Sequence, residues 1–238
     1  MTTEQLGRQE NENKSRLIRI GLMGPVGAGK STLAKLLGKR WKTNILTEDF
    51  GENPFLANFY TDPQEFNLKS QIWFLEAKIH QLKNHPGPII DPALEMDALY
   101  AKTHKEIGWM SEDDWHLYEN AYQELVQASN IQKPDVFILV NANSHTLFER
   151  IRERKRVYEL NMLRETPEYF AKLSQAVDTW ANEAERERIP IMRIDTGYYN
   201  FTKNKDYREE TLRRVEAFVA VLFLQEGTGW ELPKFKNE

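Results

Sequence analysis

Apolar residues fall into two patterns along the chain, short unbroken runs and longer stretches with helical spacing. The unbroken runs predict buried strands at 16–23, 44–48, 88–91, 135–141 and 189–194. The helical spacing predicts helices at 30–41, 54–60, 64–83, 94–107, 112–128, 167–186 and 206–224, and one that begins at 144 and runs into 150–156. Strands that alternate with helices predict an α/β fold with a five-stranded parallel sheet flanked by helices.

One such domain, over residues 16–224, accounts for most of the 238 residues. Residues 1–15 are polar and have no apolar segment of the kind found in signal peptides, so we expect a disordered tail there. We expect residues 225–238 to be irregular. No apolar stretch approaches the roughly 20 residues of a membrane-spanning helix.

The charge and the composition exclude several classes of function. With 32 basic and 36 acidic side chains, the net charge of -4 disfavours general binding to nucleic acid. The absence of cysteine excludes disulfides, thiolate catalysis and cysteine-ligated zinc, and the five histidines have no metal-binding spacing. We therefore expect a cytoplasmic protein that binds neither nucleic acid nor a membrane.

A glycine-rich segment between the first predicted strand and the first helix carries the strongest functional signal. Residues 24–31, GPVGAGKS, fit the phosphate-loop pattern G-x-x-x-x-G-K-[ST] at each fixed position, and they have the strand before them and the helix after them that this loop requires. Glycines let backbone N–H groups turn toward phosphate oxygens, and the N-terminus of the helix adds free N–H groups.

The loop predicts binding of ATP with Mg²⁺. Lys30 would place a positive charge against the β- and γ-phosphates, and Ser31 would supply a hydroxyl group to the metal ion. The predicted nucleotide-binding residues of the loop are Gly24, Val26, Gly27, Ala28, Gly29, Lys30, Ser31 and Thr32. The motif does not identify the group that accepts the phosphate.

Glu48 ends the second predicted strand, which we expect to lie directly beside the strand of the phosphate loop. Ligands of parallel sheets bind beyond the carboxyl ends of the strands, so a carboxylate there can take a proton from a hydroxyl group that attacks the γ-phosphate. Two other interpretations of Glu48 stay open, a Mg²⁺ ligand and a surface carboxylate. Asp91, at the end of the third strand, is a further predicted Mg²⁺ ligand.

The segment around Glu48 resembles the deoxynucleoside kinase family, especially its bacterial purine-type members. The resemblance is carried by 47–56 (TEDFGENPFL), by 59–63 (FYTDP) and by the helix that contains Gln71, and it covers most of the chain. It implies the fold of a P-loop nucleoside or nucleotide kinase, and a general base at Glu48.

The resemblance also assigns the substrate side of the site. It implies that Gln71 hydrogen-bonds the nucleobase, that Tyr60 reaches the sugar 3′-hydroxyl, and that Lys78 and Asp97 lie near the base. A side-chain amide offers a donor and an acceptor together, which suits the edge of a base. The same resemblance implies a homodimer, because the helices before and after the third strand pair subunits in this family.

A basic segment at 150–156, RIRERKR, resembles the arginine-rich lid of the family. Arg154, Arg156 and Glu159 match its pattern Arg-x-Arg-x-x-Glu. Guanidinium groups clamp phosphate oxygens and stabilise the transferring group, so the resemblance implies catalytic roles for both arginines. It implies that Glu159 closes on the 3′-hydroxyl. A solvated, charged helix end is the alternative interpretation.

Two further contacts with ATP are predicted. Arg152 lies within the basic segment, and residues 195–203, DTGYYNFTK, resemble the loop that holds the adenine of ATP. The pair Asn200 and Phe201 stands where the family commonly has Asp-Phe.

The chain departs from the family after the third strand, where the family has an acidic-Arg-Ser motif. This chain has 91–93, DPA, so Pro92 replaces the arginine. Loss of one such cation costs about 10²- to 10³-fold in rate unless another replaces it. Arg152 and Lys102 are the residues expected to do so.

We predict a deoxynucleoside kinase that transfers the γ-phosphate of ATP to the 5′-hydroxyl of a deoxynucleoside, with a purine or deoxycytidine favoured. The alternatives are a kinase of another small acceptor on the same fold and a catalytically degenerate nucleotide-binding protein, which Pro92 would explain. A P-loop NTPase that acts on protein or nucleic acid would need a carboxylate after the strand at 135–141, where the sequence has 141–143, NAN.

Overall fold

The computed structural model describes residues 16–48, 50–84, 87–198, 201–226 and 230–231. Its centre is a sheet with the strand order β3-β4-β2-β5-β6, in which every pairing is parallel. These strands are β2 (Ile20–Met23), β3 (Ile45–Thr47), β4 (Ile89–Asp91), β5 (Val136–Asn141) and β6 (Ile191–Asp195). The predicted five-stranded parallel sheet is confirmed.

The middle of the sheet is buried on both faces, which explains the unbroken apolar runs in the sequence. All residues of β2 are buried, and so are the first five residues of β5. The two strands pair with Ile20 opposite Val136 and Met23 opposite Leu139. A parallel strand that is covered by helices on both faces needs apolar side chains in both directions.

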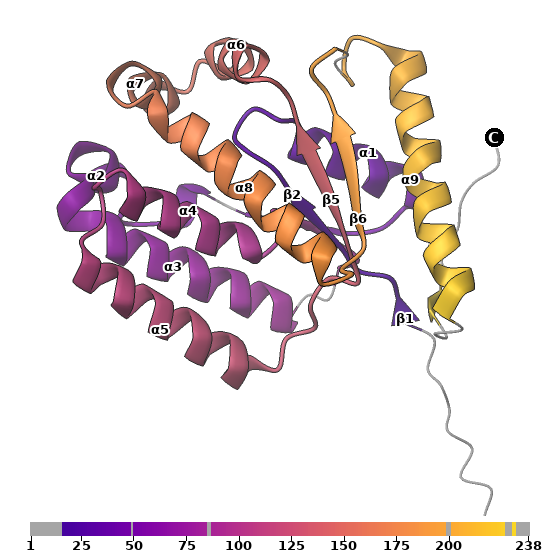
Figure 1. The fold of residues 1–238 in the computed structure, drawn as a ribbon, viewed down its shortest axis with the longest axis horizontal. Helices are drawn as coiled ribbons and strands as arrows, with labels where there is room; N and C mark the ends of the chain where they lie inside the picture. Colours follow the sequence, from indigo (N-terminus) through magenta and orange to yellow (C-terminus); the bar gives the residue numbers. More distant parts are fainter. Residues whose placement is uncertain (1–15, 49, 85–86, 199–200, 227–229, 232–238) are drawn as a thin grey trace, which may run out of the picture.

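Helices cover both faces of the sheet (Figure 1). They are α1 (Lys30–Trp41), α3 (Pro63–Asn84), α4 (Glu95–Glu106), α5 (Glu112–Ser129), α8 (Glu168–Arg186) and α9 (Lys205–Glu226). On one face α1 and α9 share a core with β2, β5 and β6; on the other face α4 packs against α8 and α3, and α5 lies outermost. Among the described residues, no helix is long and apolar enough to cross a lipid bilayer.

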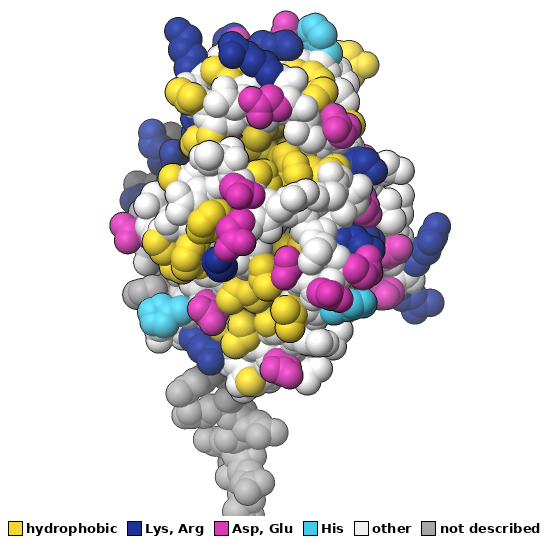
Figure 2. Space-filling model, turned by 90° about the vertical axis from the view of Figure 1, so that its left-hand side faces the viewer, with side chains coloured by type: hydrophobic (Ala, Val, Ile, Leu, Met, Phe, Trp, Pro, Cys, Tyr) yellow, Lys and Arg dark blue, Asp and Glu magenta, His cyan; other side chains and the backbone are white. Residues whose placement is uncertain are grey.

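Shorter elements complete the molecule. They are η1 (Phe50–Glu52), α2 (Leu56–Thr61), α6 (Ser144–Arg154), α7 (Val157–Glu165), and a separate parallel pair of strands, β1 (Arg16–Leu17) and β7 (Trp230–Glu231). α6 and α7 lie at the top of the view in Figure 1, and Figure 2 shows that Lys and Arg side chains gather at the top of the adjacent face. The basic segment therefore lies at one end of the molecule, above the carboxyl ends of the strands.

The structure corrects several expected elements. The strand predicted at 16–23 is divided into β1 and β2, and the helix α7 was not predicted. The segment at 225–238 is not irregular throughout, because α9 continues to Glu226 and Trp230–Glu231 pair with β1. The tail predicted at 1–15 lies outside the described residues.

The strand order corrects the expected place of Glu48. β4 lies between β3 and β2, so the strand that precedes Glu48 is not beside the strand of the phosphate loop. The chain crosses over through α1 to form β3 two positions away, and it then returns through α3 to insert β4. Strand adjacency is a long-range property, which order along the sequence does not determine.

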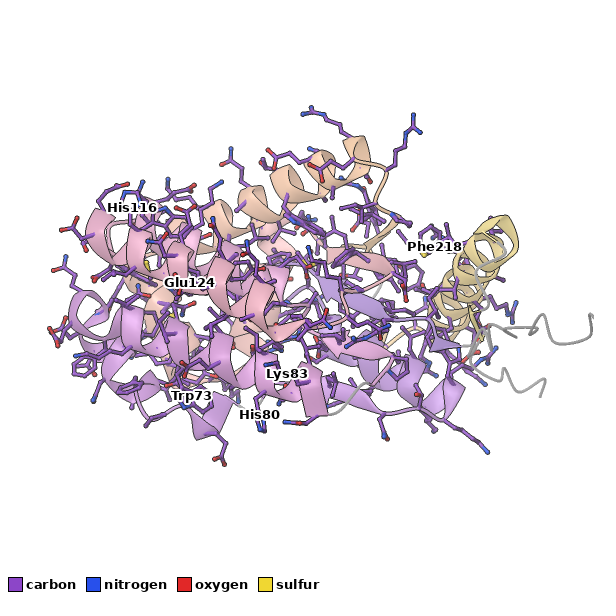
Figure 3. The ribbon with its side chains drawn as sticks, turned by 90° about the horizontal axis from the view of Figure 1, so that it is seen from below. Trp73, His80, Lys83, His116, Glu124 and Phe218 are labelled. Atoms are coloured by element: carbon purple, nitrogen blue, oxygen red, sulfur yellow. The ribbon has the colours of Figure 1, made fainter. Side chains whose placement is uncertain are left out.

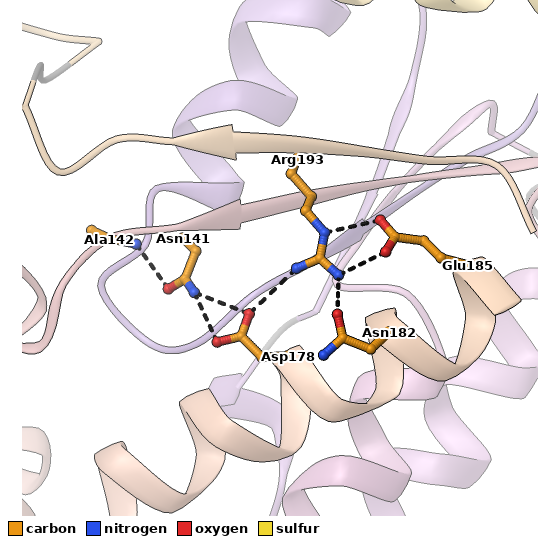
Figure 4. Close-up of polar contacts among 6 residues, drawn as sticks. All are labelled: Asn141, Ala142, Asp178, Asn182, Glu185 and Arg193. Atoms are coloured by element: carbon orange, nitrogen blue, oxygen red, sulfur yellow. Dashed lines mark hydrogen bonds and ion pairs between the residues drawn. The ribbon is translucent and has the colours of Figure 1, made fainter.

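A polar network ties α8 to the end of the sheet (Figure 4). The amide of Asn141, the last residue of β5, accepts a hydrogen bond from the N–H of Ala142 and faces Asp178 of α8 at 3.4 Å. Arg193 of β6 lies 3.7 Å from Asp178 and donates to Glu185 at 2.9 Å. These ion pairs are partly exposed, so each contributes little to stability, and the apolar core carries most of it.

We expect Ile138→Ala to lower the free energy of unfolding by about 2–5 kcal/mol, because Ile138 is fully buried in β5 and its truncation leaves a cavity. Val221→Ala, at a position of α9 that is 52% exposed, is the matched control and should change that free energy by less than about 0.5 kcal/mol. Urea unfolding followed by circular dichroism measures both values. Equal effects of the two substitutions would contradict the assigned core.

Candidate active site

The phosphate loop connects β2 to α1, and glycines with positive φ give it its shape. Gly24 has a φ of 141°, and a Cβ atom there would overlap the backbone carbonyl oxygen of Val140 on β5. Gly29 has a φ of 109° and precedes α1 without a side-chain cap, so the N–H groups of the first helical turn are open to a ligand. Such φ values favour glycine, and free N–H groups at a helix N-terminus suit a phosphate.

Lys30, the first residue of α1, folds back over the loop. Its ammonium group donates hydrogen bonds to the carbonyl oxygens of Gly24 (2.6 Å) and Pro25 (3.1 Å). Burial lowers the pKa of Lys30 to about 8, against the opposing charge of Asp91. A triphosphate would offer this ammonium group stronger, charged acceptors than the neutral carbonyls.

A cavity of about 670 Å³ extends from the phosphate loop across the carboxyl ends of the strands to α3 and α4. Most of the predicted site residues line it. They are Val26, Gly27, Gly29, Lys30, Ser31, Thr32, Glu48, Tyr60, Gln71, Asp91, Asp97, Arg154, Arg156 and Glu159. The structure thus brings the phosphate loop, the carboxylates at the strand ends and the lid to one place.

Glu48, Asp91 and Asp97 all line this cavity. The N–H of Glu48 donates to the carbonyl oxygen of Asp91 (3.3 Å), which joins the ends of β3 and β4. Asp97 of α4 hydrogen-bonds the side chain of Glu48, and burial, followed by the charge of Glu48, raises the pKa of Asp97 well above its usual value. We therefore assign the proton of this pair to Asp97.

Lys78 of α3 approaches Glu48 from another side. Its Nζ lies 3.4 Å from Oε1 of Glu48 and donates a hydrogen bond to the carbonyl oxygen of Pro92 (3.1 Å). Its side chain is 0% exposed and does not line the 670 Å³ cavity. In this structure Lys78 contacts Glu48, and its expected contact with the nucleobase stays a prediction.

Within the lid, Glu159 of α7 is 5% exposed and lies against the two arginines. Its Oε1 lies 3.1 Å from Nη1 of Arg156 and 3.9 Å from Nη1 of Arg154. Tyr158 accepts a hydrogen bond from Arg156 (3.2 Å), and its ring stacks on Tyr60 of α2 with centroids 4.5 Å apart. These contacts connect the lid to α2 along the wall of the cavity.

His104 and Gln71 line the cavity from the helical side. The amide nitrogen of Asn67 donates to the carbonyl oxygen of Trp109 (3.2 Å), which fixes the orientation of that amide. Its oxygen, 3.0 Å from Nδ1 of His104, can only accept, so Nδ1 carries the proton. Burial lowers the pKa of His104 to about 3, which keeps the ring neutral and leaves Nε2 as a hydrogen-bond acceptor.

Some predicted residues lie elsewhere. Arg152 is exposed on α6 and does not line the cavity. Phe201 is 3% exposed and packs in the core behind the loop. Gly24 and Ala28 shape the loop without lining the cavity, and Asn200 lies outside the described residues.

Arg150 and Thr196 brace the phosphate loop, and the sequence analysis missed both. Arg150 donates to the hydroxyl group of Thr196 (2.7 Å) and to its carbonyl oxygen (2.5 Å), and more weakly to the carbonyl oxygens of Gly27 (3.4 Å) and Ala28 (3.3 Å). Thr196 also donates to Ala28 at 2.9 Å. The sequence spacing could have indicated Arg150. Arg150 and Arg154 are four residues apart and share a helix face, whereas Arg152 lies on another face.

Among the described residues, no three His, Asp or Glu side chains form a cluster that could hold a metal ion by themselves. The oxygen donors at the cavity nevertheless suit Mg²⁺, which usually takes one or two carboxylates and completes its shell with phosphates and water. Oδ1 of Asp91 is buried without a hydrogen-bond partner. Ser31, Asp91 and Glu48 are therefore the residues that would hold Mg²⁺ beside a nucleotide.

The parallel sheet, the phosphate loop and the arginine lid define a P-loop kinase fold. The profile of the deoxynucleoside kinase family matches residues 20–220, so the chain belongs to this family, whose members are ATP-dependent phosphotransferases.

Individual relatives agree with this assignment. A deoxyguanosine kinase of Lactobacillus acidophilus is 30% identical over 82% of this chain and 88% of its own length. A deoxyadenosine/deoxycytidine kinase of Bacillus subtilis is 26% identical over 84% of this chain and 92% of its own length. The structure of a deoxyadenosine kinase from M. mycoides with bound dCTP has a TM-score of 0.72 and 25% identity, and the match covers 83% of this chain and all of that one.

We expect the affinity for ATP to fall as the pH rises above about 8, because the phosphates bind the charged form of Lys30 and raise its pKa in the complex. The loss should approach about tenfold per pH unit between the pKa values of the free and bound states. Isothermal titration with Mg²⁺-ATP from pH 7.5 to 9.5 measures it. Lys30→Met should bind more weakly and without this slope, and a flat profile of the unaltered protein would contradict the assignment.

Proposed function

We propose that this protein is a deoxynucleoside kinase that transfers the γ-phosphoryl group of ATP to the 5′-hydroxyl of a deoxynucleoside. The observation that carries the proposal is the cavity on which the phosphate loop, Glu48, Gln71 and the lid arginines meet. A triphosphate on the loop and a nucleoside between α3 and α4 would bring the acceptor hydroxyl beside Glu48. The relatives named deoxyguanosine kinase and deoxyadenosine/deoxycytidine kinase support this class of acceptor.

Glu48 acts as the general base. As the 5′-oxygen attacks the γ-phosphorus atom, its proton passes to the Glu48 carboxylate, and ADP leaves with the electrons of the broken P–O bond. Asp97 already holds a proton, so it supports Glu48 as a hydrogen-bond donor and does not compete for the proton. Mg²⁺, bound to the phosphates, would neutralise part of their charge.

The lid supplies positive charge to the transferring group. Arg154 and Arg156 line the cavity and are paired with Glu159, so a triphosphate would compete with that carboxylate for the two guanidinium groups. Glu159 would then be free to accept a hydrogen bond from the sugar 3′-hydroxyl, and Tyr60 lies within the same group of side chains. Closure of the lid would exclude water and limit hydrolysis of ATP.

The acceptor is a deoxynucleoside whose base carries an exocyclic amino group, which adenine, guanine and cytosine share. Nε2 of the neutral His104 accepts hydrogen bonds, and His104 lines the cavity together with Gln71. An amino group satisfies this acceptor, whereas a carbonyl group in the same place would repel it and leave it unpaired. Thymidine is therefore disfavoured.

The alternative of a P-loop NTPase that uses a carboxylate after β5 is not supported. Asn141 occupies that position, faces Asp178 on α8 and does not line the cavity. A cytoplasmic location and a homodimer remain predictions from the sequence and the family resemblance.

With Mg²⁺-ATP, the protein should form the 5′-monophosphate of one or more of the four common deoxynucleosides. Glu48→Gln should lower kcat by about 10²- to 10⁴-fold, because it removes the general base. Glu106→Gln, at an exposed position of α4, is the matched control and should have unaltered activity. Absence of product with every deoxynucleoside, although ATP binds, would overturn the proposed function.

His104→Phe should reduce the preference for deoxyadenosine over purine 2′-deoxyriboside, which has hydrogen in place of the 6-amino group. The expected loss is about 2- to 10-fold in the ratio of kcat/KM, the value of one hydrogen bond of about 0.5–1.5 kcal/mol. His116→Phe, on the exposed side of α5, is the control. If His104→Phe leaves the ratio unchanged, His104 does not contact the base.

A further inference from the structure

We propose that Lys78 is a positioning residue for Glu48. Lys78 is a buried cation that compensates the charge of the Glu48 carboxylate and orients it toward the substrate. The inference rests on the proposed function, because it gives Lys78 a role through the general base. It also replaces the nucleobase contact that the family resemblance implied for Lys78, and it identifies the cation that stands in for the arginine lost at Pro92.

The contacts of Lys78 support a role at Glu48. Its Nζ has two oxygen neighbours, Oε1 of Glu48 at 3.4 Å and the carbonyl oxygen of Pro92 at 3.1 Å. Its side chain is fully buried and contributes nothing to the wall of the large cavity. A group in this place can act on the reaction only through the residues that it touches.

A second cavity is lined by both Lys78 and Glu48. This cavity, of about 250 Å³, is lined by Lys78, Trp73 and His80 of α3 and by Glu48, which lines the large cavity as well. Trp73 and His80 project from α3 at the lower edge of the view in Figure 3. Glu48 therefore borders both cavities, whereas Lys78 borders the smaller one and not the larger one.

The buried carboxylate of Glu48 needs a counter-ion that does not bind the substrates. The side chain of Glu48 is 9% exposed, so its carboxylate would be poorly solvated there without a counter-ion. Lys30 lies at the phosphate loop, where a triphosphate would engage it. Lys78 instead donates a hydrogen bond to the backbone carbonyl oxygen of Pro92. Pro92 is the residue that replaces the arginine of the family.

The two residues expected to replace that arginine do not reach Glu48. Arg152 is exposed on α6 and Lys102 is exposed on α4, and neither lines the large cavity. Among the described residues, the ion pair recorded for Glu48 is the one with Lys78. The backbone carbonyl oxygen of Pro92 accepts the hydrogen bond from Lys78, so this ammonium group lies next to the residue that replaces the arginine.

The test is a double-mutant cycle between Lys78→Gln and Glu48→Gln, with kcat and KM measured for the best deoxynucleoside. Lys78→Gln removes the charge and keeps a donor for the Pro92 carbonyl oxygen. We expect it to lower kcat by about 10- to 100-fold in the unaltered protein and by less than about threefold in the Glu48→Gln background, because it acts through that carboxylate. KM for the nucleoside should change by less than about twofold.

Two further variants make the outcome decisive. Lys78→Arg should recover at least a third of the unaltered kcat, because it restores the charge, and Lys102→Met on the exposed face of α4 should have no effect. An equal loss from Lys78→Gln in both backgrounds, or a rise in KM with kcat unchanged, would overturn the proposal in favour of a structural or nucleobase role. If the Lys78→Gln variant does not fold, Lys78→Arg alone tests the proposal. A loss of kcat in Lys78→Arg as large as that in Glu48→Gln would overturn the proposal. An unaltered protein without activity would instead overturn the proposed function.

Discussion

Parallel pairing of β2 with β4 and β5 brings the carboxyl ends of these strands to one edge of the sheet, and the site is built on that edge. β2 leads into the phosphate loop, β4 ends at Asp91, and the carbonyl group of Val140 in β5 leaves room only for glycine at position 24. β6 leads to Thr196, which with Arg150 braces the loop from the other side. The apolar core therefore fixes the positions of groups that never contact it.

The site also buries several ionisable groups. Pairing between them limits the free-energy cost of removing charge from water. Lys78 lies against Glu48 and Arg156 against Glu159, while Asp97 avoids the cost by keeping its proton. A triphosphate would draw on Lys30 and the lid arginines, but not on Lys78. Some cations of the site would thus bind the phosphates, and Lys78 would pair with the general base, Glu48. The negative charge of Glu48 would then remain compensated when the nucleotide binds.

Local patterns in the sequence predicted most elements within a few residues, because apolar periodicity records burial directly. The phosphate loop was predictable for a similar reason, since its residues are consecutive. Long-range properties could not be predicted in this way. One is the position of β4 between β3 and β2. Another is the pairing of Lys78 with Glu48, which depends on the packing of α3 against β3 and β4. The hydrogen bonds that make His104 an acceptor join Asn67 to residues about forty positions away, which no local pattern records.

The most direct test of the central claim, that the cavity couples cleavage of ATP to an acceptor hydroxyl beside Glu48, is the dependence of ADP release on that hydroxyl group. Phosphorus NMR of a reaction with deoxyadenosine should show one 5′-monophosphate for each ADP. The same reaction with 2′,5′-dideoxyadenosine, which fits the cavity but lacks the acceptor, should release ADP at a rate lower by about 10²-fold or more, the scale of a lost catalytic interaction. Equal rates of ADP release with the two compounds, with inorganic phosphate as the product, would contradict the account.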